Sequence, residues 1–327
     1  MTEPARTLAR LTDGFLSTQL LYVAAELGIA DALVTGPATA NEVAAAVGAR
    51  PDPLLRVLRG LAADGVLDEL PEGRFGLSST GALLVTDVPG SMRGAVLARG
   101  RLYYTAAGEL LPAIRDGGTP FELVHGRPFF AHLAGRPDEA AAFRASMAVR
   151  SQREAGAVVE AYDFGGFSRL VDVGGGPGVL LRAVLDAHPT LDGLLFDRPE
   201  VVTGASLPAV GGDFFDAVPA GADAYLLSRV IHDWNDDDAV AVLSCCRRAM
   251  PQHATLLLVE AVLPVRAVDD PEAIRMDLHM LALLGGRERT AAEYTALLAA
   301  AGLALNRIIP TAAGVSVLEC CRADVSR

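Results

Sequence analysis

A run of closely spaced glycines after a short apolar segment constrains this chain of 327 residues more than any other feature. Residues 171–178 read Val-Asp-Val-Gly-Gly-Gly-Pro-Gly, and the apolar segment begins at Leu170. Glycine adopts positive φ angles at little cost and lets a ligand approach the backbone closely. A helical pattern follows over Val179–Ala187, and the start of a helix offers free N–H groups to a negative group. The pattern therefore predicts a strand, a tight turn and a helix that bind a small ligand.

The spacing of these glycines narrows the choice of ligand. A dinucleotide-binding loop has the pattern G-x-G-x-x-G, but Val179 stands where its last glycine would be. Instead, Gly174, Gly176 and Gly178 give G-x-G-x-G after an acidic residue, Asp172. This loop resembles the S-adenosylmethionine loop of class I methyltransferases. The resemblance implies that the amino-acid part and the sulfonium of S-adenosylmethionine lie over the glycines.

The segments on both sides of the loop predict the fold around it. From Leu170 onward, short apolar strands alternate with helical patterns, which is typical of a mainly parallel sheet. Ligands of such sheets bind at the carboxyl ends of the strands. The expected strands are Leu170–Val173, Gly193–Phe196, Tyr225–Leu227 and Thr255–Glu260, and the expected helices include Val179–Ala187 and Asp236–Met250.

Two acidic positions follow the loop in the order expected of this kind of site. Asp197 ends the next strand roughly 20 residues on, where a carboxylate can accept hydrogen bonds from both ribose hydroxyls. Asp213 and Phe214 come next, and they are expected to contact the adenine amino group and ring. Taken alone, Asp197 is equally well read as a turn residue before Arg198-Pro199.

A second stretch carries the candidate chemistry. Residues 227–238 read Leu-Ser-Arg-Val-Ile-His-Asp-Trp-Asn-Asp-Asp-Asp, which puts His232 just beyond a strand. This stretch is similar to one in the caffeate, chalcone and hydroxyindole O-methyltransferases, whose architecture the bacterial enzymes that tailor aromatic polyketides share. Further similar segments contain Glu260 and Glu288. The resemblance spans nearly the whole chain and implies that His232 is a general base oriented by the two glutamates.

The resemblance also implies a fold and a set of contacts. The expected fold class is α/β, with a Rossmann-like domain built on a mainly parallel seven-stranded sheet and a mostly helical N-terminal winged-helix dimerisation domain. Two positions depart from the plant enzymes, because Ser228 replaces a lysine and Arg229 a tryptophan. The expected cofactor contacts are Asp172, Gly174, Gly176, Asp197, Arg198, Gly212, Asp213, Phe214, Ser228 and Arg229.

The acceptor pocket is less well defined by the sequence. The segment from Asp277 to Met280 resembles one that lines this pocket in the family. Methionines could line an aromatic pocket or pack in the core with equal ease. The expected acceptor contacts are Met147, Asp233, Met276 and Met280.

The transfer of a proton from a phenol to an ordinary histidine is energetically unfavourable. A phenol of pKa about 10 and an imidazole of pKa about 6.5 differ by roughly 3.5 units, or about 4.8 kcal/mol. A glutamate that accepts from the second ring nitrogen of His232 would raise the basicity of the imidazole. Bound S-adenosylmethionine, with S-adenosylhomocysteine as its product, completes the expected reaction on a small aromatic acceptor.

The first third of the chain has a winged-helix pattern of helices followed by a hairpin near Pro71–Gly73. Leu16–Leu27 is an expected helix that stops at Gly28, and Thr39 to Glu42 resembles a capping box. A DNA-binding winged helix should present a basic stripe, but this segment is slightly acidic. We therefore expect residues 1–105 to form a homodimerisation domain and residues 106–327 to form the catalytic domain.

Composition excludes several other classes of protein. The net charge of −12 argues against nucleic acid as a partner. No apolar run reaches the roughly 18–20 residues of a membrane span, and the N-terminus has no apolar signal region, so a cytoplasmic location is expected. The four cysteines stand in adjacent pairs without the spacing of a zinc site. Asp236–Asp238 suit a helix start capped by Asn235 better than a metal site, so no metal is expected.

Other functions remain open on the sequence. Some bacterial relatives bind S-adenosylmethionine yet hydroxylate or decarboxylate an aromatic polyketide, although the presence of His232, Glu260 and Glu288 favours methyl transfer. A ligand-sensing transcription factor built on the winged helix is a third hypothesis. Methyl transfer to nitrogen or carbon is a minor variant, because a neutral amine has less need of a base.

Overall fold

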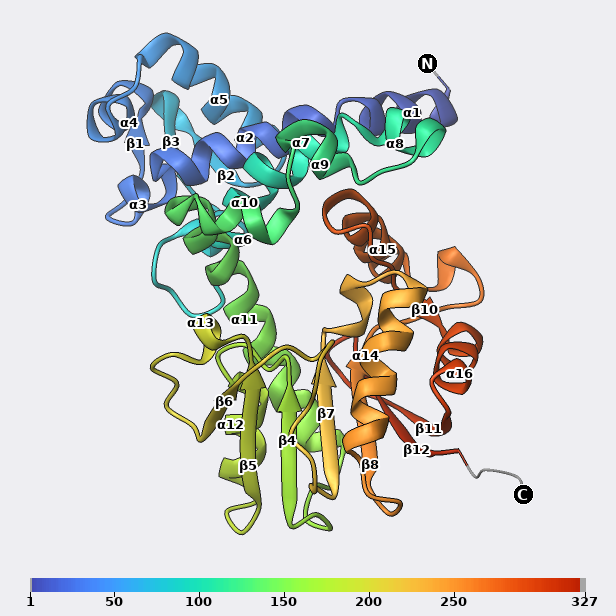
Figure 1. Ribbon diagram of the computed structural model, residues 1–327. Helices are drawn as coiled ribbons and strands as arrows, with labels where there is room; N and C mark the ends of the chain where they lie inside the picture. The colour runs from blue at the N-terminus through green and yellow to red at the C-terminus, as the bar shows by residue number, and fades with distance from the viewer. Residues whose placement is uncertain (1, 324–327) are drawn as a thin grey trace. The chain divides into compact units, whose positions relative to one another are not determined.

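The computed structural model describes residues 2–323, apart from the side chain of Val149. The chain forms two compact units on either side of the bond between Val149 and Arg150. Helix α11 (Pro137–Ala161) carries the chain from one unit into the other (Figure 1). No helix of the described residues has the length and apolar character needed to cross a membrane.

The first unit is mostly helical. Its small three-stranded sheet has the order β1-β3-β2, and its core is formed by helices α2 to α5 with these strands. The helices are α1 (Glu3–Thr12), α2 (Gly14–Leu27), α3 (Ile29–Leu33), α4 (Ala40–Val47), α5 (Pro51–Ala63), α6 (Arg93–Ala98), α7 (Tyr104–Ala107), α8 (Leu110–Asp116), α9 (Pro120–His125) and α10 (Phe129–Ala134). The strands are β1 (Ala38–Thr39), β2 (Leu67–Leu70) and β3 (Arg74–Leu77), and the short helical turns are η1 (Pro71–Gly73), η2 (Gly81–Leu84) and η3 (Arg99–Tyr103).

The local patterns that predict the winged helix are confirmed. Helix α2 ends at Gly28, whose φ of 71° is the left-handed conformation that favours glycine. The Thr39 hydroxyl accepts from the Glu42 N–H, and the Glu42 carboxylate accepts from the Thr39 N–H, so the capping box is formed. Strands β2 and β3 form the antiparallel hairpin.

The second unit is built on a seven-stranded sheet of order β11-β12-β8-β7-β4-β5-β6. Strands β4 to β8 are parallel, whereas β12 runs antiparallel to β8 and β11 antiparallel to β12. The predicted fold class, a mainly parallel seven-stranded sheet, is confirmed. The strands are β4 (Arg169–Val173), β5 (Asp192–Asp197), β6 (Ala209–Gly211), β7 (Ala224–Ser228), β8 (Thr255–Glu260), β11 (Leu303–Pro310) and β12 (Ser316–Arg322).

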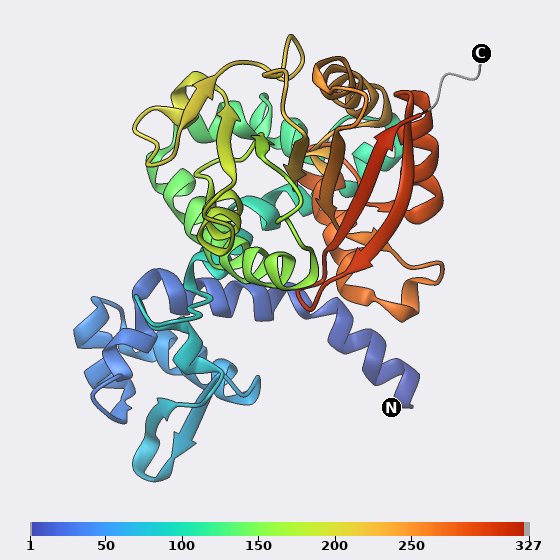
Figure 2. The same ribbon diagram turned by 90° about the horizontal axis from the view of Figure 1, so that it is seen from below.

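Helices cover both faces of this sheet, as the strand sequences require. Side chains alternate between the faces: Tyr225 and Leu227 pack in one core with α14 and α16, while Ala224 and Leu226 pack in the other with α12 and the end of α11. Figure 2 shows the sheet between these layers from a second direction. The helices are α12 (Val179–Ala187), α13 (Pro199–Val202), α14 (Asp236–Ala249), α15 (Pro271–Leu283) and α16 (Ala291–Ala300), with the turns η4 (Ile231–Asp233) and η5 (Ala267–Asp269) and a small parallel pair β9 (Val262–Leu263) and β10 (Arg289–Thr290).

The strand order creates one crevice at the edge where the parallel strands end. After β4 the chain moves to β5 on one side, and later returns to β7 on the other side of β4. Connections that leave a sheet in opposite directions open a ligand crevice at the carboxyl ends of the strands. The loop at Gly174 follows β4 and the loop at Arg229 follows β7, so both predicted site segments start at this point.

The boundary between compact units differs from the one expected between functional domains. Helices α7 to α10 and the first half of α11 belong to the first unit, whereas the sequence predicts a functional boundary after residue 105. A sequence pattern marks where helices begin and end but not which core each helix packs against. The functional boundary therefore stays a prediction.

We predict that Leu257→Ala in the middle of β8 lowers the free energy of unfolding by about 2–5 kcal/mol, because it leaves a cavity in a close-packed core. The Leu257 side chain is fully buried. Urea unfolding followed by circular dichroism measures the change. The matched control is Val265→Ala, which removes apolar atoms from a fully exposed side chain and should change stability by no more than about 0.5 kcal/mol. Equal losses in the two variants would contradict the packing described for the sheet.

Candidate active site

The glycine loop is held close to the end of the neighbouring strand. Gly174, Gly176 and Gly178 have φ angles of 72°, 57° and 76°, which are strained for residues with a side chain. The Gly174 N–H donates to the Phe196 carbonyl at 2.7 Å, and the Gly176 N–H donates to Asp197 Oδ2 at 2.8 Å. A Cβ atom at Gly176 would meet no atom within 4 Å, so this part of the loop faces open space.

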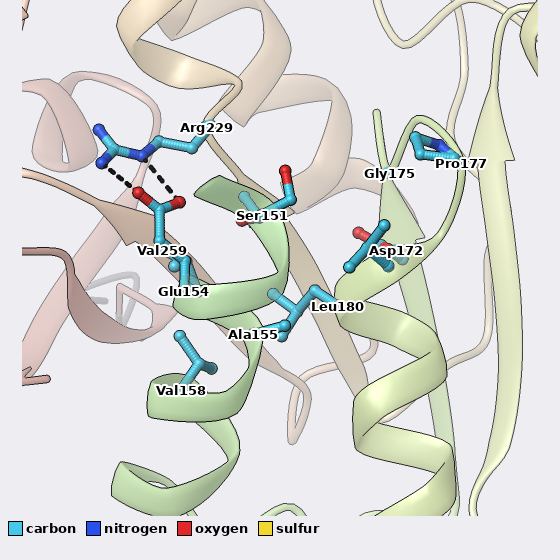
Figure 3. Close-up of a pocket in the computed structure, with 12 residues that line it drawn as sticks. Ser151, Glu154, Ala155, Val158, Asp172, Gly175, Pro177, Leu180, Arg229 and Val259 are labelled. Atoms are coloured by element: carbon cyan, nitrogen blue, oxygen red, sulfur yellow. Dashed lines mark hydrogen bonds and ion pairs between the residues drawn. The ribbon is translucent and has the colours of Figure 1, made fainter. Parts of the chain in front are cut away.

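A small cavity lies behind the loop. It has a volume of about 80 Å³ and is lined from four directions, by α11, the end of β4 with the loop, α12, and the ends of β7 and β8 (Figure 3). This volume suits one end of a ligand rather than a whole cofactor, since complete ligand pockets are about 300–1,000 Å³. Its polar lining residues are Ser151, Glu154, Asp172, Ser228 and Arg229.

Asp172 is the most unusual group in this cavity. Its side chain is buried, and its Oδ1 atom has no hydrogen-bond partner. Burial, followed by the nearby negative charge of Asp197, raises the pKa of Asp172 to about 7. A buried carboxylate oxygen without a partner is costly, so a ligand that donates a hydrogen bond to Asp172 Oδ1 would remove this cost.

The predicted cofactor residues Gly212, Asp213 and Phe214 follow β6, at the same edge of the sheet as the glycine loop. A Cβ atom added at Gly174 would be 3.4 Å from the Phe214 ring, so Phe214 borders the glycine loop. Asp213 Oδ1 accepts from the Phe215 N–H at 2.8 Å. The absence of a side chain at Gly212 leaves room for the Phe196 ring, which a Cβ atom would meet at 2.5 Å.

Arg198 stands apart from this group. Its guanidinium pairs with Glu200 at 3.3 Å and is largely exposed. Only its backbone N–H contacts the site, by donating to Asp197 Oδ1 at 2.7 Å. Its role in cofactor binding stays a prediction.

His232 lies in the turn after β7, between two buried carboxylates. Its Nδ1 atom is 2.8 Å from Glu288 Oε1 and 3.9 Å from Glu260 Oε2. Glu260 Oε1 instead accepts from the backbone N–H groups of Val230 and Ile231, at 3.0 and 2.8 Å. Of the two predicted glutamates, Glu288 makes the hydrogen bond to the histidine and Glu260 fixes the turn that carries it.

These charges determine the proton affinity of the imidazole. Burial by itself opposes a charged imidazole, but the negative charges of Glu260, Asp233 and Glu288 outweigh it and raise the pKa of His232 to about 9. Burial also opposes ionisation of Glu288, but its hydrogen bond to His232 and the charge of Arg229 lower the pKa of Glu288 below the ordinary value. An ionised carboxylate only accepts hydrogen bonds, so the proton on His232 sits on Nδ1 and Nε2 is the basic atom.

Arg229 connects this pair to helix α11. Its guanidinium donates to Glu154 Oε1 at 2.7 Å (Figure 3) and to Glu288 Oε1 at 3.2 Å. Arg229 has a φ of 56°, which is uncommon for a residue with a side chain and is found where the surroundings enforce it. The predicted cofactor residue Arg229 therefore contacts carboxylates of the site as well as lining the cavity, and the neighbouring Ser228 also lines it.

A buried arginine fixes the far side of the His232 turn. Arg289 is fully buried and donates to the carbonyls of Ile231 at 3.1 Å and Trp234 at 2.9 Å. It also pairs with Asp236 at the start of α14. The Arg287 N–H donates to the His232 carbonyl at 2.9 Å. The segment that carries Glu288 is thus attached to the His232 turn along its whole length.

The predicted acceptor residues are divided between the units. Met276 and Met280 lie on α15, half-buried and buried respectively, in the second unit. Met147 lies on α11 within the first unit. Asp233 Oδ1 is 3.3 Å from His232 Nε2, which places this carboxylate beside the basic nitrogen.

Three residues of the network, Glu154, Arg150 and Arg289, were missed by the sequence analysis, and Asp277 was named only as the start of a segment near the acceptor pocket. Glu154 and Arg150 lie one helical turn apart on α11 and form an ion pair at 2.9 Å. The i to i+4 spacing of opposite charges is a readable signal, but it is common on exposed helices. Asp277 Oδ1 accepts from the Glu288 N–H at 2.9 Å, and Arg289 was passed over although it adjoins Glu288 in the sequence.

A glycine loop at the switch point of a seven-stranded sheet, with an acidic residue before it and another at the end of the next strand, is the architecture of a class I methyltransferase. The chain belongs to the O-methyltransferase family: the O-methyltransferase domain matches residues 108–304, and the O-methyltransferase dimerisation domain matches residues 9–87. It is a methyltransferase that uses S-adenosylmethionine, as the family resemblance of the sequence predicts.

Known proteins of this family are similar over almost the whole chain. The phenazine O-methyltransferase PhzM of Lysobacter antibioticus is 43% identical over 95% of this chain and 94% of its own length. The crystal structure of LaPhzM matches with a TM-score of 0.91 and 41% identity over 98% of this chain and 100% of that one. NcsB1 from neocarzinostatin biosynthesis, solved with S-adenosylmethionine and 2-hydroxy-5-methyl naphthoic acid, matches with a TM-score of 0.84 and 35% identity over 94% of this chain and 96% of that one. Both O- and N-methyltransferases occur among further relatives.

We predict a raised pKa for His232 that depends on Glu260. The imidazole should titrate near pH 9, because its folded pKa is raised from the ordinary value of 6.5. Glu260→Gln removes the largest of the charges that raise this pKa, so the titration should move to lower pH. NMR of protein with carbon-labelled histidine measures both values, and His232→Gln assigns the signal by its loss. A titration near pH 6.5 in the wild type would contradict the electrostatics described here.

Proposed function

We propose that the enzyme transfers a methyl group from S-adenosylmethionine to a hydroxyl, phenolic in character, of a small aromatic natural-product intermediate, with His232 as the general base. The observation that carries the proposal is the buried hydrogen bond of 2.8 Å between His232 Nδ1 and Glu288. It leaves Nε2 as the atom that can take a proton.

The residues around the glycine loop fit S-adenosylmethionine. The unpartnered, buried Oδ1 atom of Asp172 suits the ammonium group of the methionine part, and the open face of Gly176 leaves room over the loop. Asp197 would accept from the ribose hydroxyls, and Asp213 with Phe214 would contact the adenine. Gly174, Gly212, Ser228 and Arg229 would complete this side, whereas Arg198 would contribute its backbone. When bound, S-adenosylmethionine supplies an electrophilic methyl group on a sulfonium that leaves as a neutral thioether.

The protein's part in the reaction is to hold the acceptor and to move one proton. The acceptor hydroxyl would donate to His232 Nε2, and the proton would pass to this nitrogen as the oxygen forms its bond to the methyl carbon. A base of pKa about 9 lies only about 1 unit below a phenol of pKa about 10, or about 1.4 kcal/mol. The free energy of proton transfer from the phenol is therefore much closer to zero than with an ordinary imidazole. Glu288 stabilises the imidazolium that forms.

The acceptor would lie beside Asp233, with Met276 and Met280 of α15 as apolar contacts. Met147 belongs to the first unit, and its predicted contact with the acceptor stays a prediction. Support for an aromatic acceptor comes from the relatives, which include enzymes named for a phenazine, a hydroxybenzoate and a naphthoate. Methyl transfer to nitrogen occurs among the relatives too. The buried His232–Glu288 pair favours oxygen, because a neutral amine attacks without a base. None of these relatives is named as a hydroxylase or decarboxylase, so that alternative gains no support.

The trio of His232, Glu260 and Glu288 has the composition of a metal site, with ligand atoms within 4.8 Å of one another. We interpret it as a proton-holding network instead. His232 Nδ1 carries the proton that Glu288 accepts, and Glu260 Oε1 is engaged by two backbone N–H groups.

The first third of the chain would serve a homodimer. The O-methyltransferase dimerisation domain covers residues 9–87, within the residues 1–105 that we assign to this role, and residues 106–327 would carry out catalysis. Helices α1 and α2 leave large apolar side chains exposed, which a second copy of the chain would cover: Leu8, Leu11, Phe15 and Leu16.

We predict that His232→Gln lowers kcat about 10²- to 10⁴-fold, the usual contribution of a general base, while the affinity for S-adenosylmethionine stays within about threefold. Transfer of labelled methyl to a panel of phenols, catechols and hydroxynaphthoates measures kcat, and calorimetry measures cofactor binding. Asn306→Ala on β11 is a control at an exposed position. Unchanged methyl transfer by His232→Gln would rule out the base.

We also predict that kcat/KM rises with pH from about pH 6 to about pH 9 and then levels off. The sign follows from the raised pKa: His232 is protonated below pH 9 and accepts a proton only in its neutral form. Initial rates measured with a saturating cofactor give the profile. A rate that does not change across this range would show that proton removal by His232 does not limit the reaction.

A further inference from the structure

Arg150 has an unused donor in the interior of the second unit. Its Nε atom donates to Glu154 Oε1 at 2.9 Å, and its Nη1 atom lies 3.5 Å from the sulfur of Met276. Its Nη2 atom is buried without a hydrogen-bond partner. By contrast, each of the three nitrogens of Arg229 contacts a carboxylate. Since a thioether is a weak acceptor, one edge of the Arg150 guanidinium is left unsatisfied.

Arg150 is not among the residues that line the cavity behind the glycine loop. Ser151 and Glu154 line that cavity (Figure 3), whereas Arg150 contacts Met276 on α15. Burial raises the pKa of Asp233, and the positive charge of Arg150 acts against this rise; the same charge adds to the effects of His232 and Arg229 that lower the pKa of Glu288. The guanidinium therefore lies close enough to act on the groups around His232, on the side proposed for the acceptor.

The buried atoms of the site that lack a hydrogen-bond partner are of two chemical kinds, acceptors and donors. Of the buried side-chain nitrogens and oxygens without a partner among the described residues, three near the site are carboxylate oxygens, of Asp172, Glu260 and Glu288, and one is the Arg150 Nη2 atom. The carboxylate oxygens can accept hydrogen bonds from donors of a ligand. Only Arg150 offers donors and a positive charge, and it shares its one carboxylate partner, Glu154, with Arg229.

A guanidinium edge with free N–H groups in a buried site is best satisfied by a carboxylate, which accepts two parallel hydrogen bonds. A water molecule or a neutral carbonyl would satisfy one N–H group but would leave Arg150 with a single carboxylate partner, Glu154, which Arg229 also contacts. The exchange of the Met276 sulfur for a carboxylate oxygen replaces a weak acceptor with a strong one.

We propose that Arg150 binds a carboxylate carried by the acceptor, so that the substrate is a hydroxylated aromatic acid. This inference rests on the proposed function for the location of the acceptor beside His232. Two fixed points, the carboxylate at Arg150 and the hydroxyl at His232 Nε2, orient a planar substrate and select the hydroxyl that is methylated.

The experiment compares two acceptors that differ only in the charge of one group: a hydroxynaphthoate and the hydroxynaphthamide with its hydroxyl at the same ring position. Steady-state methyl transfer is measured for the wild type, Arg150→Gln and Arg150→Lys. The matched control is Arg153→Gln, which makes the same change of charge at an exposed position of the same helix. Glu154 keeps its ion pair with Arg229 at 2.7 Å when Arg150 is replaced, and thermal unfolding checks that each variant is folded.

We predict that the wild type prefers the acid over the amide by about 10- to 100-fold in kcat/KM, the range expected of a charged hydrogen-bonded pair. Arg150→Gln should remove this preference by lowering kcat/KM for the acid alone, mainly through KM. Arg150→Lys should restore part of this preference, because lysine keeps the positive charge but cannot donate two parallel hydrogen bonds. Arg153→Gln should keep the whole preference.

Equal losses for acid and amide in Arg150→Gln would overturn the inference, since they would show a purely structural role. Methyl transfer to both compounds without any preference in the wild type would overturn it too, yet would leave the proposed function standing. If neither compound is methylated, calorimetry with protein saturated with S-adenosylhomocysteine measures whether the acid and the amide bind. Binding of the acid that depends on Arg150, without methyl transfer, would support the inference and defeat the proposed function, whereas equal binding of acid and amide would defeat the inference.

Discussion

The buried carboxylate of Glu260 is the contact on which the geometry of the site depends. It is fully buried at the end of β8, and it accepts the two backbone N–H groups that begin the turn after β7. From the other side, Arg289 donates to two carbonyls of the same turn. His232 therefore sits on a backbone that is fixed by both a central strand and a distant segment.

The charges around this turn form a continuous chain of contacts. It runs from His232 to Glu288, to Arg229, to Glu154 and to Arg150. Buried ion pairs often contribute little to net stability, because removing charges from water costs about as much as the pairing returns. Their value here is chemical: they keep Glu288 ionised, raise the proton affinity of His232, and hold Arg229 in a backbone conformation that it would not adopt alone.

Membership of the O-methyltransferase family accounts for the glycine loop, the strand order and the histidine with its glutamates. It does not account for the choice of acceptor. The unit that holds the loop and the base also holds the unpartnered edge of Arg150, next to Met276. Glu154 links the two sides, because it lines the cavity behind the loop and pairs with Arg150. In the proposed site, the cofactor side and the acceptor side would therefore share one carboxylate.

The sequence by itself determined the local structure and the identities of the central residues. Glycine spacing, apolar alternation and the caps at Thr39 and Asn235 act over a few residues, and the structure forms them where the sequence predicts. The roles of His232, Glu260 and Glu288 followed from a resemblance and remain predictions. Only the tertiary structure brought Glu154 to Arg229, which is 75 residues away, and Arg150 to Met276, which is 126 residues away. Such pairs depend on how a helix face docks against a sheet edge, and no spacing along the chain encodes that contact.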